Sequence, residues 1–124
     1  MARVFGDLEL QYVREVLDSG QLGWADGRMV TRLERAFAAK VGARFGIARN
    51  SAMTALAQAV SVSGAGTGTE VICDPIVHFG AVAALYFNAV PRFADVRYDT
   101  YLLDPASVRA NITDKTKALI VTNL

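Results

Sequence analysis

Two hydroxyl residues, Ser51 and Thr54, stand where a short apolar run changes into a helix-forming pattern. The start of a helix leaves its first backbone N–H groups without partners and carries about half a positive charge, so it stabilises a phosphate or a carboxylate. The two hydroxyl groups could donate further hydrogen bonds to such an anion. Asn50 and Ser51 are also ordinary N-cap residues, and a capped helix need not bind anything. The junction therefore has two interpretations, an anion site and a plain helix cap.

The elements that must position this junction alternate between strand and helix patterns. Short apolar runs predict strands, and helical spacing predicts the helices between them. Asp104 before Pro105 is typical of an N-cap followed by proline at the first helical position. The predicted strands are 45–48, 70–73, 93–96 and 117–124, and the predicted helices are 52–63, 78–88 and 105–111. Continuous apolar strands with short joints favour an α/β fold, a mainly parallel sheet with helices on both faces.

The first 43 residues form a separate helical segment in this interpretation. Asp7 is expected to cap a helix at 7–18, and a second helix is expected at 29–40, before Gly42. The loop between Gly20 and Gly27 has no periodicity and carries the only tryptophan, Trp24. The predicted organisation is therefore an N-terminal helical segment at 1–43 and an α/β part at 44–124.

Composition limits the classes of protein to which the chain can belong. Apolar residues make up 52% of the 124 residues before glycine is counted, against about 45–50% with glycine included in typical domains. A small monomer should need more polar cover, so the surplus predicts an oligomer interface or a longer protein. The net charge of +1 without a basic tract argues against nucleic acid and anionic membranes as partners.

Three further features concern the cellular location of the protein and whether the chain is part of a longer one. The apolar segment 76–90 is too short to span a bilayer, and no signal-peptide pattern opens the chain, so a cytoplasmic protein is expected. The single cysteine, Cys73, lies in a predicted buried strand, where an inert thiol is expected. The sequence stops at the carboxyl end of the last predicted strand, with no following helix. Ligand-binding groups collect beyond the carboxyl ends of strands in open α/β sheets. We therefore expect the chain to be the front part of a larger protein.

A collinear series of short motifs runs through the chain. They are Val16–Gly20 with Leu22-Gly23, Leu33-Glu34 with Phe37-Ala38 and Gly42, Asn50-Ser51 with Ala55-Leu56, Gly64–Ile72, Pro75 with Phe79, Pro91–Val96, Asp99–Tyr101 with Asp104-Pro105, and Ile112-Thr113 with Thr116–Ala118. Their succession resembles the N-terminal part of the DegT/DnrJ/EryC1/StrS family of sugar aminotransferases. The resemblance implies the incomplete large domain of a fold type I enzyme that uses pyridoxal phosphate.

The resemblance assigns the cofactor phosphate to the junction at Ser51, Ala52, Met53 and Thr54. In the family, backbone amides and a threonine hydroxyl at this helix start hold the phosphate. This sequence departs from the pattern, because Ala52 replaces the usual glycine and Met53 the usual threonine. Methionine cannot donate a hydrogen bond. Either Ser51 or Thr54 substitutes for the lost hydroxyl, or phosphate binding rests on amides alone.

Phe79 matches the family's aromatic residue that lies flat against the pyridine ring, where stacking would add about 0.5–1.5 kcal/mol to area burial. The alternative is an ordinary core phenylalanine. His78 stands where the family often has threonine, and it could approach the cofactor or substrate, or cap the following helix. Trp24 and its loop resemble a segment near the active site and dimer interface, and a tryptophan packed on its own domain is the alternative.

The residues that perform the family's covalent chemistry are expected beyond Leu124. These are the lysine that holds the cofactor and the aspartate that pairs with its pyridine nitrogen. Asp95 matches a structural position, and Asp104 is most simply an N-cap. None of the lysines matches the catalytic position; they are Lys40, Lys115 and Lys117. The resemblance therefore implies no catalytic residue in this chain and an inactive fragment.

The complete enzyme implied by the resemblance is a homodimer that passes an amino group from an amino-acid donor, glutamate or glutamine, to a nucleotide-linked keto sugar. Two alternatives stay open. One is a sugar dehydratase of the same fold, with histidine in place of the cofactor-binding lysine. The other is a non-catalytic anion-binding or regulatory module. The coding sequence after Leu124 would discriminate among the three: continuation to a lysine-bearing loop supports the aminotransferase, histidine at that place the dehydratase, and a stop codon the non-catalytic module.

Overall fold

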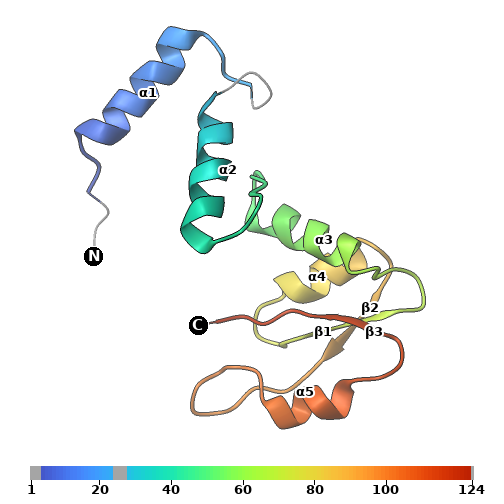
Figure 1. Ribbon diagram of the computed structural model, residues 1–124. Helices are drawn as coiled ribbons and strands as arrows, with labels where there is room; N and C mark the ends of the chain where they lie inside the picture. The colour runs from blue at the N-terminus through green and yellow to red at the C-terminus, as the bar shows by residue number, and fades with distance from the viewer. Residues whose placement is uncertain (1–3, 24–27, 124) are drawn as a thin grey trace. The chain divides into compact units, whose positions relative to one another are not determined.

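A computed structural model describes residues 4–23 and 28–123 of the chain (Figure 1). The chain divides into two compact units, Met1–Ala48 and Arg49–Leu124. The first contains α1 (Asp7–Ser19) and α2 (Arg28–Val41), and the second contains α3 (Ala52–Val62), β1 (Glu70–Cys73), α4 (Phe79–Leu85), β2 (Val90–Phe93), α5 (Pro105–Asn111) and β3 (Thr116–Leu119). Within the described ranges, every helix is too short or too polar to cross a membrane.

The second unit is built on a three-stranded parallel sheet in the order β2-β1-β3. The central strand β1 is apolar and buried along Val71, Ile72 and Cys73, as expected for a parallel strand covered on both faces. Helices α3 and α4 lie on one side of the sheet, and α5 lies on the other (Figure 1). The predicted α/β class, a mainly parallel sheet with helices on both faces, is confirmed.

The core of this unit lies between the sheet and the α3–α4 pair. Its buried members are small or β-branched, and Met53 and Ile120 are among the half-buried residues that pack against them. The buried residues are Val60, Ala65, Val71, Ala83, Ala84 and Ala89. Gly80 allows α4 to approach the sheet closely, because a Cβ there would lie 2.7 Å from the Cβ of Cys73.

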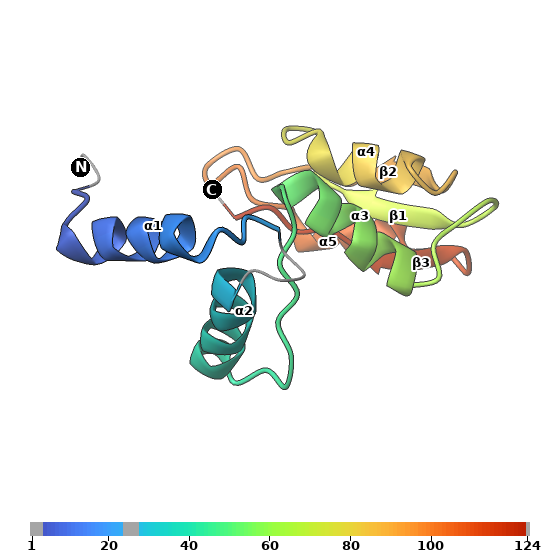
Figure 2. The same ribbon diagram turned by 90° about the horizontal axis from the view of Figure 1, so that it is seen from above.

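The two ends of the sheet have different surroundings. We call the end formed by Glu70, Val90 and Thr116 the amino edge, and the end formed by Cys73, Phe93 and Leu119 the carboxyl edge. Helix α4 follows the carboxyl end of β1 directly, and α3 begins at the same end of the sheet in both views (Figures 1 and 2). This is the edge at which ligands bind in open α/β sheets.

The predicted strand at 45–48 is wrong. The segment is extended but pairs with no strand of the described chain. Instead it runs against α2, where the Ala48 amide donates to the Glu34 carboxylate at 2.9 Å. A Cβ on Gly46 would lie 2.5 Å from the Glu34 carbonyl oxygen, so the contact requires glycine. A side chain of α2 thus takes the place of a ladder partner.

The strands predicted at 93–96 and 117–124 are shifted or shortened, because β1 ends at Cys73. The ladder of β2 begins at Val90, and Pro91 is tolerated because β2 is an edge strand of this sheet. The Ala94 amide makes the last bond, to Cys73 O at 3.0 Å. On the other side the Ile120 amide still donates to Ile72 O at 2.8 Å, but within the described chain residues 121–123 pair with no strand.

The helices agree more closely with their predictions. Helix α3 ends one residue early at Val62, and α4 covers Phe79–Leu85 rather than reaching Asn88, which adopts a left-handed conformation at φ 56°. Asp104 caps α5 as predicted, accepting from the Ala106 amide at 3.0 Å.

In the first unit, the expected cap of α1 is wrong, because Gly6 rather than Asp7 occupies the N-cap. The Glu9 carboxylate accepts from the Gly6 amide at 2.8 Å, and this hydrogen bond lowers the pKa of Glu9. Arg32 of α2 pairs with Glu15 of α1 at 2.9 Å. Ala38 is the one buried residue of these two helices in the described ranges. Most of the apolar surface of α1 and α2 is thus left uncovered in this chain.

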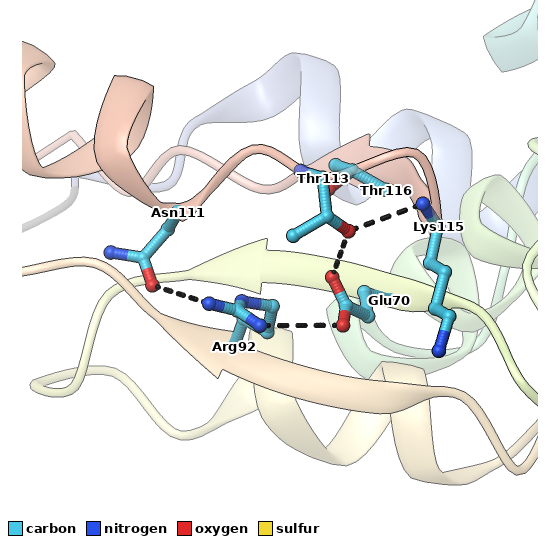
Figure 3. Close-up of polar contacts among 6 residues, drawn as sticks. All are labelled: Glu70, Arg92, Asn111, Thr113, Lys115 and Thr116. Carbon is cyan, nitrogen blue, oxygen red and sulfur yellow. Dashed lines mark hydrogen bonds and ion pairs between the residues drawn. The ribbon is translucent and has the colours of Figure 1, made fainter.

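A side-chain network fastens the amino edge (Figure 3). Glu70 of β1 accepts from the Thr113 hydroxyl at 2.6 Å and pairs with Arg92 of β2 at 3.3 Å. Arg92 also donates to the Asn111 side chain at 3.4 Å. The hydrogen bond from Thr113 lowers the pKa of Glu70; partial burial opposes the shift, and the charge of Arg92 supports it. The network therefore joins β1, β2, the end of α5 and the segment that leads into β3.

Candidate functional site

The predicted helix start at Ser51 is confirmed as the beginning of α3. Ser51 is the N-cap, with an extended backbone at φ −158° and ψ 160°, and its Oγ accepts from the Thr54 amide at 3.2 Å. The Thr54 hydroxyl lies 2.8 Å from Asn50 Oδ1 and 2.9 Å from Ser51 O, so its hydrogen is used within the junction. The Ser51 and Thr54 hydroxyl oxygens lie 3.2 Å apart, and because the Thr54 hydrogen is used elsewhere, the Ser51 hydroxyl either donates to Thr54 Oγ1 or rotates toward another acceptor.

The backbone of this first turn offers free donors. The amides of Ala52 and Met53 have no acceptor among the described residues, whereas those of Thr54 and Ala55 bond to Ser51. Ser51, Ala52 and Thr54 are exposed, and the Met53 side chain packs against the core instead. The Met53 side chain therefore contributes to the core and supplies no donor at this helix start. Two amides and one hydroxyl at a helix start form a donor set that fits a phosphate.

Phe79 and His78 stand at the start of α4, which packs beside α3. Phe79 leaves 41% of its surface exposed, so it is not an ordinary core phenylalanine in this chain. Its ring contacts that of His78 edge to face, with centroids 4.5 Å apart and an interplanar angle of 62°. His78 occupies the N-cap position but makes no side-chain cap hydrogen bond, so the capping interpretation is not supported. Two exposed aromatic rings thus lie at the carboxyl edge.

Asp74 is a residue at this edge that sequence reasoning missed. It is the one buried polar residue of the described chain, 3% exposed, at the end of β1. Burial alone would raise the pKa of Asp74, but hydrogen bonds from the Val77 amide, the Thr122 hydroxyl and the Ile76 amide lower it below its usual value. The signal in the sequence was Asp74-Pro75 directly after an apolar strand, a common start of a side-chain-stabilised turn.

Other residues singled out from the sequence lie outside this arrangement. Cys73 is fully buried, and burial together with the neighbouring Asp74 raises its pKa to about 11, which agrees with an inert thiol. Asp95 is exposed and accepts from the Val96 amide at 2.8 Å. Lys115 and Lys117 lie near the amino edge, at the start of β3. Trp24 lies outside the described residues.

Comparison with known proteins gives matches along nearly the whole chain. The sequence pattern of the DegT/DnrJ/EryC1/StrS aminotransferase family matches residues 5–124. The spore coat polysaccharide biosynthesis protein SpsC of Bacillus subtilis is 39% identical over 119 residues, which cover 94% of this chain and 30% of that protein.

Solved structures share the fold. The crystal structure of 3-amino-5-hydroxybenzoic acid synthase matches with a TM-score of 0.91 at 34% identity, covering 98% of this chain and 32% of that one. Spr1654 of Streptococcus pneumoniae, described as a sugar aminotransferase and solved in its PLP form, matches with a TM-score of 0.84 at 26% identity, covering 94% and 29%. The chain thus spans about a third or less of the proteins that it matches.

Proposed function

This chain belongs to the DegT/DnrJ/EryC1/StrS aminotransferase family, and from that premise we propose that it is the N-terminal third or so of a sugar aminotransferase, which contributes to the site for the cofactor phosphate. The predicted cofactor, pyridoxal phosphate, is the cofactor of this family, as the PLP form of Spr1654 illustrates. When bound, it supplies an electron sink that lets an amino group move between an amino acid and a carbonyl compound.

The observation that carries the proposal is the open start of α3. The free amides of Ala52 and Met53, together with the Ser51 hydroxyl, would bind the phosphate. The exposed ring of Phe79, at the start of the neighbouring helix, would pack against the face of the pyridine ring and exclude water from it. His78 beside it stays a candidate for contact with cofactor or substrate.

We also propose the classes of the amino acceptor and the amino donor. SpsC is described as a polysaccharide biosynthesis protein, which supports a sugar as the amino acceptor. Sugars destined for polysaccharides are generally carried on nucleotides, so we propose a nucleotide-linked keto sugar as acceptor and glutamate or glutamine as donor. Specificity for the sugar would reside largely in the parts of the complete protein that this chain does not contain.

We propose that the 124 residues cannot transaminate alone. In the second unit, Lys115 and Lys117 are the lysines, and both lie near the amino edge, at the opposite end of the sheet from the start of α3. Mixing the isolated chain with pyridoxal phosphate and borohydride should therefore leave no stoichiometric reduced adduct. Such an adduct would contradict this part of the proposal.

A homodimer is proposed for the complete protein. Helices α1 and α2 leave large apolar side chains exposed, among them Leu17, Leu33 and Phe37. Apolar surface on this scale is typical of an interface that another polypeptide segment covers. A cytoplasmic location and the absence of nucleic-acid or membrane partners stay predictions.

The binding part is tested by titrating the complete protein with pyridoxal phosphate. Removing one hydrogen bond to a charged group costs about 1.5–3 kcal/mol, so Ser51→Ala should weaken binding about tenfold or more. Ser61→Ala is the matched control, because Ser61 lies on the same helix and its hydroxyl donates to Gln58 O of that helix, at 2.8 Å. Equal affinities in the two variants would refute the assignment of Ser51.

The reaction is tested by incubating the complete protein with a nucleotide-linked keto sugar and an amino donor. Replacement of the carbonyl oxygen by an amino group, detected by mass spectrometry, is expected. Loss of a sugar hydroxyl without gain of nitrogen would identify the dehydratase alternative instead. Binding of the cofactor without either product would favour the non-catalytic module.

A further inference from the structure

The carboxylate of Asp74 lies directly after β1, before the turn into α4, and nothing in the proposed chemistry uses it. Its side chain is buried at the end of the central strand, where an ionised group needs partners to offset its desolvation. Three partners are present. Oδ1 accepts from the amides of Ile76 and Val77 at 3.0 and 2.7 Å, and Oδ2 accepts from the Thr122 hydroxyl at 2.7 Å.

These bonds join two segments of the carboxyl edge. The first is the turn 75–78, which leads from β1 into α4 and therefore sets where His78 and Phe79 stand. The second is the segment that follows β3, in which Thr122 lies beyond the last ladder bond of Ile120. Without Asp74, neither the two amides of the turn nor the Thr122 hydroxyl would keep this acceptor.

Close packing against the sheet also fixes the first turn of α4. Its Gly80 lies so close to the sheet that a Cβ would meet the Cβ of Cys73 at 2.7 Å and Cγ2 of Ile120 at 3.4 Å. The start of α4 is therefore held by packing at Gly80 and by hydrogen bonds to Asp74. A ring that must lie against a flat ligand needs such a fixed base, because small misplacements weaken stacking.

We propose that Asp74 is a positioning residue for the cofactor site: through the turn 75–78 and Thr122 it holds the first turn of α4, and with it Phe79, in the geometry that receives the aromatic ring of the cofactor. This inference rests on the proposed function. It assigns to Asp74 no contact with substrate or cofactor, only an action through the turn.

The test uses the complete protein and two readouts, the dissociation constant for pyridoxal phosphate and the circular dichroism of the bound cofactor in its visible band. Asp74→Ala should weaken binding about tenfold, because two turn amides and one hydroxyl lose a charged acceptor. Thr122→Val should weaken it about threefold and reduce the dichroic band, and Thr122→Ser should restore both, because serine keeps the hydroxyl.

Glu70→Gln is the control, because Glu70 is a bonded carboxylate on the same strand but lies at the amino edge. It should leave affinity and dichroism unchanged. Wild-type affinity and dichroism in Thr122→Val, or in a folded Asp74→Ala, would overturn the positioning role while leaving the proposed function intact. If Asp74→Ala does not fold, the Thr122 pair decides. Failure of the unaltered protein to bind pyridoxal phosphate would instead overturn the proposed function, and this inference with it.

Discussion

The two ends of the parallel sheet differ in how their polar groups are satisfied. At the amino edge, side chains bond to one another: Glu70 of β1 and Arg92 of β2 are linked to Asn111 at the end of α5 and to Thr113 before β3. At the carboxyl edge, one buried carboxylate, Asp74, bonds to backbone amides and a distant hydroxyl, while the start of α3 keeps free amides. The difference is that most polar groups of the amino edge bond within the chain, with Arg92 Nε as an exception, whereas the carboxyl edge has exposed helix-start amides left for an anion.

We expect the largest loss of stability from Gly80→Ala, at the carboxyl edge. The new Cβ would overlap the Cβ of Cys73, and such overpacking costs about 1–3 kcal/mol, more than the gain of up to about 1 kcal/mol from helix propensity. Urea unfolding of the complete protein should show the loss, and affinity for pyridoxal phosphate should fall too. Gly66→Ala is the control, since the nearest atom to its Cβ would be Phe87 O at 3.8 Å. Equal stability of the two variants would contradict the close packing of α4.

We expect a smaller loss of stability when the Asp74 carboxylate is protonated or replaced. Its pKa is lowered in the folded state, so its stabilising contribution is present above the ordinary aspartate pKa of about 3.9 and is lost as the pH falls through the folded value. Asp74→Asn should cost about 1–2 kcal/mol of the free energy of unfolding at neutral pH. The difference between the two proteins should shrink below the ordinary pKa. A difference that stays constant across this range would rule out an ionised Asp74.

A still smaller loss of stability is expected from Glu70→Gln at the amino edge. The amide keeps an acceptor for the Thr113 hydroxyl but loses the charge that faces Arg92. The pKa of Glu70 is lowered in the folded state, so the lost stabilisation should again be present above the ordinary glutamate pKa and vanish in acid. Thermal unfolding in low and high salt should show a loss that salt reduces. An accompanying loss of cofactor affinity would mean that the two edges are not independent.

The smallest effect on binding is expected from Met53→Thr, which restores the residue usual in the family. Because the side chain at 53 packs against the core, the new hydroxyl should not reach the phosphate, and affinity should stay within about twofold. Stability should fall, because apolar contacts are lost. A clearly tighter complex in the titration would show that the side chain at 53 points to the ligand after all.

The sequence predicted those elements of the fold that depend on residues close together in the chain. Ser51 and Asp104 begin helices because their side chains accept from amides two or three residues onward. The strand at 70–73 was predictable because a continuous apolar run needs cover on both faces. The segment 45–48 has a similar run, but a carboxylate of α2 takes its amide, and that contact joins residues 14 positions apart.

The site was predictable in part for the same reason. The junction at Ser51 could be located from capping chemistry and family motifs, and the structure adds that the Met53 side chain turns away from it. Asp74 was missed because its role depends on Thr122, which lies 48 residues later in the chain. The order β2-β1-β3 brings these residues together, and no local pattern encodes that order.

That long separation has a consequence for synthesis on the ribosome. Because β1 is the central strand and its second neighbour β3 is the last strand of this chain, the nascent polypeptide exposes one flank of β1 until residue 122 has emerged. Domains generally fold as units during synthesis, with the N-terminal domain first. The turn that positions Phe79 therefore gains its hydrogen bond to Thr122 only after Phe79 itself has been made.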